Sequence, residues 1–197
     1  EGIVDPDHSI RKWSGEQFWN SDWNRDLSFQ DAFQSSCVWY FREVVDDIGK
    51  ERMQKVLDEI TYGNRDISDW KGEQNKNNNN RALTGFWIES SLKISPKEQT
   101  EVMERIFSER SAYSKESLEA LKQVMLVSEK KEKNLMIYGK TGMGKDQGTV
   151  VDAWFTGFAD ISGERIYFCV YLGETKEADV SSTKAKEIAI KLITDPG

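Results

Sequence analysis

Two short segments, Ser36-Cys37-Val38 and Lys140-Thr141-Gly142, carry side chains whose types suit chemistry, and a third short segment, Tyr62-Gly63-Asn64, lies between them in the sequence. A serine such as Ser36 can pass a proton in general acid–base catalysis, although on sequence alone it fits a helix cap better. Lys140 supplies a positive charge that can orient a hydroxyl and attract a carboxylate, unless it is a solvated lysine at a strand end. A site built from both would suit an anionic substrate that undergoes proton transfer.

Composition excludes several classes of function. The 197 residues suit one domain, over residues 1–197, with a core of its own. The net charge of −7 argues against nucleic acid as a partner, because phosphate binding needs a basic surface. One His and two Cys show no metal-ligand spacing, so no metal site is expected. No stretch is long and apolar enough to cross a bilayer, and the sequence shows no signal peptide.

The elements that must position these residues are predicted to be helices first and strands later, an α+β arrangement. Helices are expected over residues 36–48, 51–60, 96–107, 115–126 and 182–193. Strands of an antiparallel meander, rich in β-branched and aromatic residues, are expected over residues 135–140, 150–159 and 165–172. Ser95 and Glu98 form a capping box at the start of the third helix. Residues 68–85, with four Asn at 77–80, are expected to be a loop.

Two other patterns resemble binding or nucleophile motifs but fail. Residues 139–146 approach a phosphate-binding P-loop, yet Asp146 stands where a Ser or Thr hydroxyl should bind magnesium, and a strand is expected to follow instead of a helix. A Ser-x-x-Lys pattern, never with Thr second and frequent enough to arise by chance, starts at Ser9, Ser68, Ser90, Ser128 and Ser181. We therefore predict neither nucleotide binding nor a nucleophile from these patterns.

A longer series of local sequences resembles class D β-lactamases and the related penicillin-sensor domains of β-lactam-responsive membrane receptors. The series runs from near residue 11 to about residue 193. Each short match is weak alone, but their joint order and spacing are specific. Besides the three opening segments, the series comprises Lys12-Trp13-Ser14-Gly15, Asp26-Leu27, Ala32-Phe33, residues 36–41, Phe86-Trp87-Ile88-Glu89, Leu92-Lys93-Ile94-Ser95 and Trp154-Phe155-Thr156-Gly157.

This resemblance implies the penicillin-recognising α+β fold of serine β-lactamases and transpeptidases, an antiparallel sheet packed with helices, here without its N-terminal part. It implies β-lactam hydrolysis through a serine acyl-enzyme, and hence antibiotic resistance. Ser36 then resembles the second active-site serine, while Lys140 and Thr141 resemble the pair that holds the substrate carboxylate. Gly142 leaves the strand edge open to substrate, and the N–H of Met143 resembles half of the oxyanion hole.

Two more residues resemble the surroundings of a carboxylated lysine, the general base of class D enzymes. Trp87 resembles the tryptophan whose indole N–H holds that group, unless it serves core packing alone. We expect carbon dioxide or bicarbonate to carboxylate this lysine, and we expect no resident cofactor. Val38 stands where sensor domains often have Asn, and an apolar neighbour leaves the base intact, so Val38 favours a hydrolase over a non-hydrolytic sensor. A third interpretation is a degenerate penicillin-binding fold whose only role is interaction. Tyr62-Gly63-Asn64 is expected to be a turn that shapes the cleft floor.

Two departures from the family pattern set further expectations. No Ser-Thr-x-Lys nucleophile segment occurs in these residues, so we expect it upstream in a longer polypeptide and expect this chain to be inactive alone. The family's carboxylate-binding Arg is absent near the start of the last helix, and Lys184 is a candidate replacement. The expected partners are β-lactams and the missing segment, with an upstream membrane anchor and a homodimer left open. The expected location is extracytoplasmic.

Overall fold

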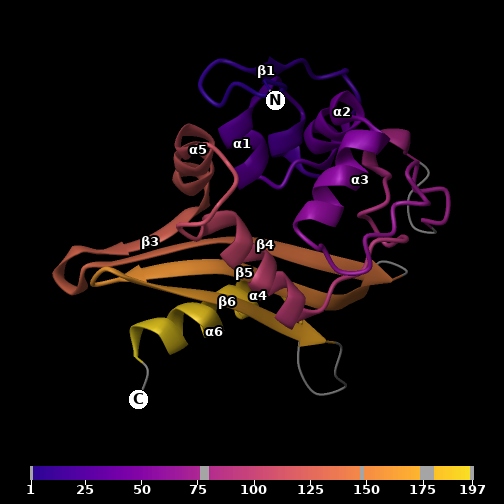
Figure 1. Ribbon diagram of the computed structural model, residues 1–197. Coiled ribbons are helices and arrows are strands. Elements are labelled where there is room, and N and C mark those ends of the chain that lie inside the picture. The colour runs from indigo at the N-terminus through magenta and orange to yellow at the C-terminus, as the bar shows by residue number, and fades with distance from the viewer. Residues whose placement is uncertain (1, 76–79, 147–148, 174–179, 196–197) are drawn as a thin grey trace.

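The computed structural model describes residues 2–75, 80–146, 149–173 and 180–195, and its helices lie about one main antiparallel sheet (Figure 1). The helices are α1 (Phe29–Gln34), α2 (Val38–Ile48), α3 (Lys50–Glu59), α4 (Pro96–Phe107), α5 (Lys115–Met125) and α6 (Ser182–Thr194). The strands are β1 (Ile10–Arg11), β2 (Leu27–Ser28), β3 (Leu126–Lys130), β4 (Leu135–Asp146), β5 (Thr149–Ile161) and β6 (Glu164–Gly173). Short 3₁₀ helices are η1 (Ser21–Trp23), η2 (Arg81–Leu83) and η3 (Lys131–Lys133).

The main sheet has the order β3-β4-β5-β6, so every neighbouring pair is also consecutive in sequence. In its centre, β4 pairs with β5 along its whole length, with Lys140 opposite Thr156 and Gly142 opposite Trp154. A separate two-stranded sheet joins β1 to β2. The register of the central pair therefore decides where the residues of the Lys140 segment stand along the sheet.

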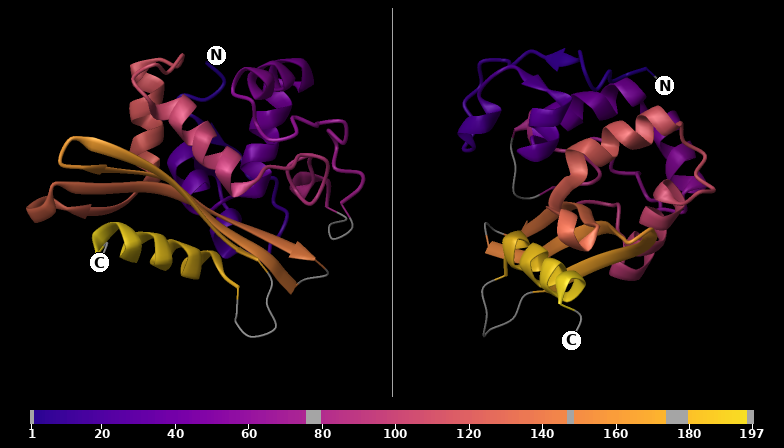
Figure 2. Two further views of the ribbon diagram at one scale, coloured as in Figure 1. Left: turned by 60° about the horizontal axis from the view of Figure 1, so that its bottom comes forward. Right: turned by 90° about the vertical axis from the view of Figure 1, so that its left-hand side faces the viewer.

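Successive side chains of β5 point to opposite faces of the sheet, and each face is covered by different helices (Figure 2). Phe155 is fully buried against Ala185 and Ala189 of α6. Phe158 is fully buried on the other face, where it packs with Phe107 of α4 and Tyr138 of β4. The sheet is thus a central layer between α6 and the remaining helices.

The N-terminal helices form a second region on the face of the sheet opposite α6 (Figures 1 and 2). One apolar cluster, centred on the buried Leu27, Trp39 and Tyr40, joins the segment before α1 to α2. A second cluster joins α3 to the loop that follows it through Leu57 and Phe86. This helical region carries Ser36 and Val38, whereas the sheet carries Lys140.

The predicted α+β arrangement with an antiparallel meander is confirmed, as is the capping box of Ser95 and Glu98 at the start of α4. One strand is longer than predicted, and another was not predicted. The strand expected over residues 135–140 continues to Asp146, because backbone pairing with β5 holds the glycine-rich part. Strand β3 was missed because Glu129 and Lys130 give it the polar character of an edge strand. In the predicted loop of residues 68–85, η2 forms, and Asn77–79 lie outside the described residues.

Candidate active site

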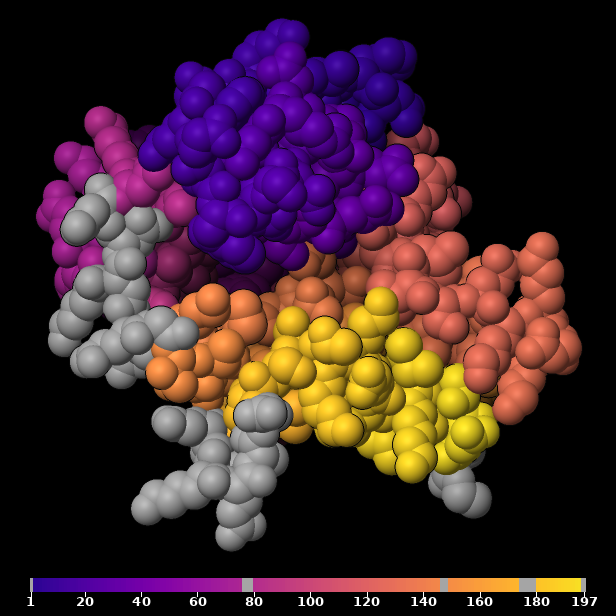
Figure 3. All heavy atoms as spheres, turned by 180° about the vertical axis from the view of Figure 1, so that it is seen from behind, coloured from indigo at the N-terminus to yellow at the C-terminus, as the bar shows by residue number. Residues whose placement is uncertain are grey.

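A cleft of about 1200 Å³ lies between the helical region and β4. Seen from behind, the surface is hollowed where the indigo helical region meets the orange strands (Figure 3). Most of its lining comes from the segment before α1, the junction of α1 and α2, the loop around residue 87, and β4, and single residues of α4, α6 and the turn after α3 and three residues of β5 complete it. The structure places all seven site residues named from the sequence on this lining, and these are Ser36, Val38, Trp87, Lys140, Thr141, Gly142 and Met143.

Ser36 lies between two helices, not inside one as the predicted helix over 36–48 required. Helix α1 ends in a Schellman motif, in which the Ser36 N–H donates to Phe33 O (3.2 Å) and the Cys37 N–H donates to Ala32 O (2.8 Å). Ser36 has the left-handed φ of 53° that this position requires. Its side chain caps neither helix, because Cys37 is the N-cap of α2 and makes no side-chain cap bond. The strained turn instead presents the hydroxyl to the cleft.

Lys140 reaches Ser36 from the opposite wall. Its Nζ donates to Ser36 Oγ and to Thr141 O (3.0 Å), with Thr141 Oγ1 at 3.4 Å. The ring of Phe33 lies under the ammonium at 5.8 Å. Burial lowers the pKa of Lys140 to about 8, since a charged amine loses hydration there. The two walls thus bring a hydroxyl and a titratable amine together, as a site for proton transfer to an anionic substrate needs.

The left-handed backbone of Ser36 predicts that the protein is more stable with glycine than with alanine at this position. Ser36→Gly is expected to raise the free energy of unfolding by about 1 kcal/mol over Ser36→Ala, because both lack the hydroxyl but only alanine keeps a Cβ at positive φ. This difference corresponds to roughly 3 °C in Tm for a chain of this size. Thermal unfolding of both variants measures it. Equal melting temperatures would show that Ser36 carries no backbone strain.

Trp87 lies beside the cleft on the loop between α3 and α4, and a glycine makes its position possible. A Cβ at Gly85 would come within 2.5 Å of the indole ring, so only glycine fits against it. The ring packs edge-on against the buried Phe86 (5.1 Å), and the Arg42 guanidinium lies over it at 5.7 Å. Within the described part of the chain the indole N–H makes no hydrogen bond, so this donor can serve a group in the cleft. Val38 begins α2, lines the cleft, and packs against the apolar cluster centred on Leu27, Trp39 and Tyr40.

The Tyr62-Gly63-Asn64 segment forms a turn that binds one loop to another. Gly63 has a φ of 51°, and a Cβ there would collide with Lys93 O. Asn64 accepts from the Lys93 N–H (3.0 Å) and donates from its side chain to Ser91 O (2.9 Å). Tyr62 lines the cleft. The segment therefore positions the loop that bears Trp87.

Lys184, the candidate for the carboxylate-binding role, is exposed on α6 and does not line the cleft, although Ser182 does. The lining instead contains residues that sequence reasoning passed over, above all Trp19 and Lys145. Lys145 belongs to the failed P-loop pattern of residues 139–146, and Trp19 belongs to no motif. Their contribution depends on contacts between segments more than a hundred residues apart, and a local pattern does not report such contacts.

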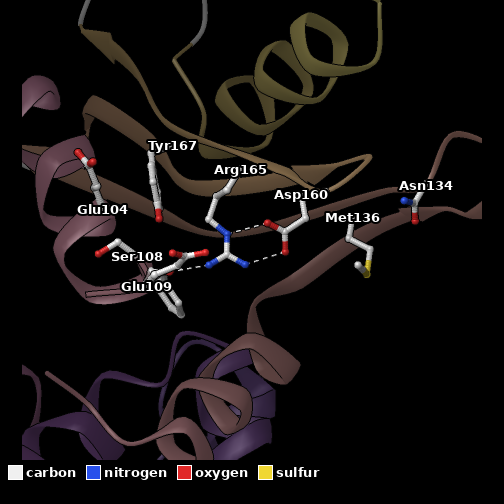
Figure 4. Close-up of a pocket in the computed structure, with 10 residues that line it drawn as sticks. Glu104, Ser108, Glu109, Asn134, Met136, Asp160, Arg165 and Tyr167 are labelled. Atoms are coloured by element: carbon white, nitrogen blue, oxygen red, sulfur yellow. Dashed lines mark hydrogen bonds and ion pairs between the residues drawn. The ribbon is translucent and has the colours of Figure 1, made fainter. Parts of the chain in front are cut away.

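A second cavity, of about 580 Å³, lies where the C-terminal end of α4 meets the β5–β6 hairpin (Figure 4). Arg165 sits in its centre and donates to both carboxylate oxygens of Asp160 (2.6 and 2.8 Å) and to Phe107 O (2.6 Å). The guanidinium also lies 4.4 Å from the ring of Phe158. These contacts use its charge to join helix to hairpin, so the cavity has a structural explanation.

Comparison with known proteins fits this geometry. The penicillin binding protein transpeptidase domain, as a family model, matches residues 1–194. The chain belongs to this family. The match covers both walls of the cleft, so the Ser36 and Lys140 segments are parts of one transpeptidase domain.

Individual relatives of this transpeptidase domain include both enzymes and receptors. The chain is 31% identical over 195 residues to a probable β-lactamase, YbxI, from Bacillus subtilis, covering 98% of this chain and 64% of the relative. It is 28% identical over 196 residues to regulatory protein BlaR1 from Bacillus licheniformis, covering 100% of this chain and 30% of that protein. The solved C-terminal domain of the Bacillus licheniformis BlaR penicillin receptor superposes with a TM-score of 0.82 at 27% identity, over 100% of this chain and 73% of that domain. The predicted penicillin-recognising fold is confirmed, and the chain corresponds to its C-terminal portion.

Proposed function

We propose that this transpeptidase domain contributes one part of the active site of a class D β-lactamase. The contact of Lys140 Nζ with Ser36 Oγ inside the cleft carries the proposal. An ammonium, a hydroxyl and a glycine-edged strand in one cleft suit an anionic cyclic amide. The serine that is acylated lies, in this proposal, on a Ser-Thr-x-Lys segment outside these 197 residues. The chain spans less than two thirds of the length of the probable β-lactamase and about a third of the regulatory protein that it matches.

In the proposed acylation, Ser36 relays a proton from the attacking serine to the leaving nitrogen. The oxygen of the upstream serine bonds to the β-lactam carbonyl carbon, and the ring C–N bond breaks. The departing nitrogen takes the proton of the Ser36 hydroxyl, and Ser36 is reprotonated by the proton that the attacking serine gave up. Lys140 and Thr141 would hold the substrate carboxylate, while the N–H of Met143 would stabilise the developing oxyanion.

A carboxylated lysine on the upstream segment would supply the general base for acylation and deacylation. The residues present suit such a group. Trp87 offers an indole N–H without a partner among the described residues, and Val38 offers an apolar contact. These two residues would hold the base and keep competing donors away from it, while bicarbonate in the buffer would support its formation.

The experiment that tests the function joins the chain to its natural upstream segment, adds bicarbonate, and follows benzylpenicillin adducts by intact mass over time. A transient adduct of the mass of the drug, together with accumulating hydrolysed penicillin, is expected. No adduct at any time would contradict the proposal. The chain without the upstream segment serves as the control, and we expect it to form no adduct.

A non-hydrolytic β-lactam sensor is the second candidate, because relatives named as a regulatory protein and a penicillin receptor match the chain about as well as the probable β-lactamase. A sensor would be acylated once and keep its adduct for hours. A stable one-to-one adduct in the experiment above would therefore select the sensor, and turnover would select the enzyme. A purely structural role would give neither result.

Val38 provides a prediction that separates the two candidates by mutation. Val38→Asn is expected to lengthen the lifetime of the adduct at least about tenfold, because an amide beside the base can donate to it and weaken its activation of water. Intact mass after removal of excess drug measures this lifetime. Val38→Ala is the matched control, since it is apolar, and it should keep turnover. An unchanged lifetime in Val38→Asn would remove Val38 from the argument for hydrolysis.

We also propose that the domain acts outside the cytoplasm, which fits relatives named as β-lactamases and as a penicillin receptor. In the described ranges no helix is long and apolar enough to cross a membrane. An anchor in upstream sequence and a homodimer stay predictions. Fractionation of cells that express the full polypeptide, with and without its upstream sequence, tests the location and the anchor.

A further inference from the structure

Trp87 belongs to a short loop whose backbone is closed on itself. The loop spans residues 86–92, and the Leu92 N–H donates to Phe86 O (3.2 Å) at its base. We name residues 86–92 the Trp87 loop. Because the two ends of this loop are joined by a hydrogen bond, a contact near its C-terminal end can set the direction of the Trp87 indole.

Asp69, from the segment between α3 and η2, makes such a contact through Ser90. Both side chains are buried, and each is 7% exposed. The Ser90 hydroxyl donates to Asp69 Oδ2. The N–H groups of Glu73 and Gln74 donate to Oδ1 and Oδ2 of the same carboxylate (2.8 and 3.1 Å). In the described ranges no lysine or arginine pairs with Asp69, so these hydrogen bonds hold its charge.

The Asp69 carboxylate carries its charge at neutral pH. Burial would raise the pKa of Asp69, but the hydrogen bonds from Ser90 and from the Gln74 and Glu73 N–H groups outweigh burial and hold this pKa below its ordinary value. A hydrogen bond to a buried charge is stronger than one between neutral groups, and it is costly to leave unmade. Ser90 is therefore held firmly, and with it the C-terminal half of the Trp87 loop.

Two other bonds hold the Trp87 loop to the same neighbouring segment. The Ser91 hydroxyl donates to Asp66 O (3.0 Å), and the Asn75 side chain donates to Ile88 O (2.9 Å). Both bonds join uncharged groups. They keep the loop attached when the Ser90 hydroxyl is removed, so we expect the loss of this hydroxyl to change the orientation of the loop and not its attachment.

We propose that Asp69 and Ser90 are positioning residues for the general base of the proposed reaction. Neither lines the cleft, so both act through the Trp87 loop, which aims the indole N–H at the lysine of the upstream segment. This inference rests on the proposed function. When that lysine is carboxylated, its neutral amine bonds to the carbon of carbon dioxide and releases one proton. An indole N–H aimed at the resulting carboxylate stabilises it and raises its occupancy at a given bicarbonate concentration.

Carbamate occupancy tests the proposal without any antibiotic. The full polypeptide is titrated with isotopically labelled bicarbonate, and carbon NMR follows the carbamate signal that disappears when the upstream lysine is replaced by alanine. Ser90→Ala is expected to raise the half-saturating bicarbonate concentration about tenfold, because a misdirected indole loses most of a hydrogen bond to a charged group. Asp69→Asn is expected to raise it as well, since an amide nitrogen cannot accept the bonds that one carboxylate oxygen accepts.

Ser114→Ala is the matched control. Ser114 is the N-cap of α5, where its hydroxyl accepts from the Ser117 N–H (3.2 Å), and it does not line the cleft. Its loss should lower Tm but leave the half-saturating bicarbonate concentration unchanged. Saturating bicarbonate should also restore the acylation rate of Ser90→Ala with benzylpenicillin, which a general loss of packing would not allow. Circular dichroism checks that each variant is folded.

The outcomes separate the positioning role from the reaction. If the wild-type lysine is carboxylated and either Ser90→Ala or Asp69→Asn keeps the half-saturating concentration within twofold, the positioning proposal is overturned while the proposed function stands. If Ser114→Ala raises this concentration as much as Ser90→Ala, the effect follows stability and the proposal is likewise overturned. If the wild type shows no carbamate at any bicarbonate concentration, the carboxylated lysine of the proposed function fails, and this inference fails with it.

Discussion

Replacing Lys140 with methionine is expected to slow acylation by benzylpenicillin at least about a hundredfold in the full polypeptide. The ammonium contacts Ser36 Oγ and Thr141, so its loss removes both the orientation of the proton donor and the charge for the carboxylate. A positioned proton donor alone contributes about 10²–10⁴ in rate, and a charge-assisted hydrogen bond adds to this. Methionine has a similar length and fits against Phe33, so the fold is expected to persist. Acylation kinetics by intact mass give the rate, and circular dichroism checks the fold.

The methyl ester of benzylpenicillin separates the two roles of Lys140. The ester has no ring carboxylate, so wild type should already be slow with it, and Lys140→Met should reduce its rate by a smaller factor. Equal factors for acid and ester would assign Lys140 to the orientation of Ser36 alone. A loss below fivefold with the acid would remove Lys140 from the mechanism.

The pH dependence follows from the burial that lowers the pKa of Lys140 to about 8. Above this pH the amine loses its proton, so acylation by carboxylated drugs should fall as pH rises through 8. Lys140→Arg stays charged and should flatten this alkaline limb. Between about 8 and the ordinary value of 10.5, the folded chain binds fewer protons at this residue than the unfolded chain. The contribution of Lys140 to stability therefore rises with pH over the window in which acylation falls. A wild-type profile that matches that of Lys140→Arg would contradict this assignment.

Local sequence was sufficient for elements whose signals lie within a few residues. The serine, proline and glutamate at the start of α4 satisfy free backbone groups by themselves, so the helix start could be predicted. The extension of β4 through its glycine-rich half could not, because pairing with β5 imposes it. The same holds for Ser36, whose turn depends on how α1 ends: a Schellman motif there is unusual without glycine.

The candidate site likewise combines residues that local motifs predict and residues that only the fold brings together. Ser36, Lys140 and Trp87 could be named because their motifs resemble a family, but their separation of up to 104 residues is closed by packing that no motif describes. Trp19 and Lys145 belong to no motif, and only the approach of the helical region to β4 brings them together. Resemblance thus supplies residues that lie in short motifs, whereas the structure supplies those that only the fold brings together.

The position of Trp87 depends on a buried arginine that neither composition nor motif suggested. Arg42 of α2 is 6% exposed, and its Nη1 donates to Thr84 O (2.9 Å) and Trp70 O (3.2 Å). Its other nitrogens bind both carboxylate oxygens of Asp46 (2.9 and 3.2 Å). One planar guanidinium therefore ties two points of the loop that leads to Trp87 onto the helix that begins with Val38.

Arg42→Met is accordingly expected to lower the free energy of unfolding by about 3 kcal/mol, because two loop carbonyls lose their shared donor and each unsatisfied buried group costs about 1–3 kcal/mol. The Asp46 pair adds little, since that carboxylate is half exposed. Urea unfolding measures the change.

Arg105→Met is the matched control. Arg105 also donates to one carbonyl, Ile60 O, and pairs with Glu101, but it lies on an exposed helix face. Its loss should therefore cost under about 1 kcal/mol. Arg42→Lys should recover less than half of the loss, because an ammonium cannot reach both carbonyls and the carboxylate in one plane. If Arg42→Met were no less stable than Arg105→Met, the loop would be held by its apolar contacts through Phe86 and Trp70 instead.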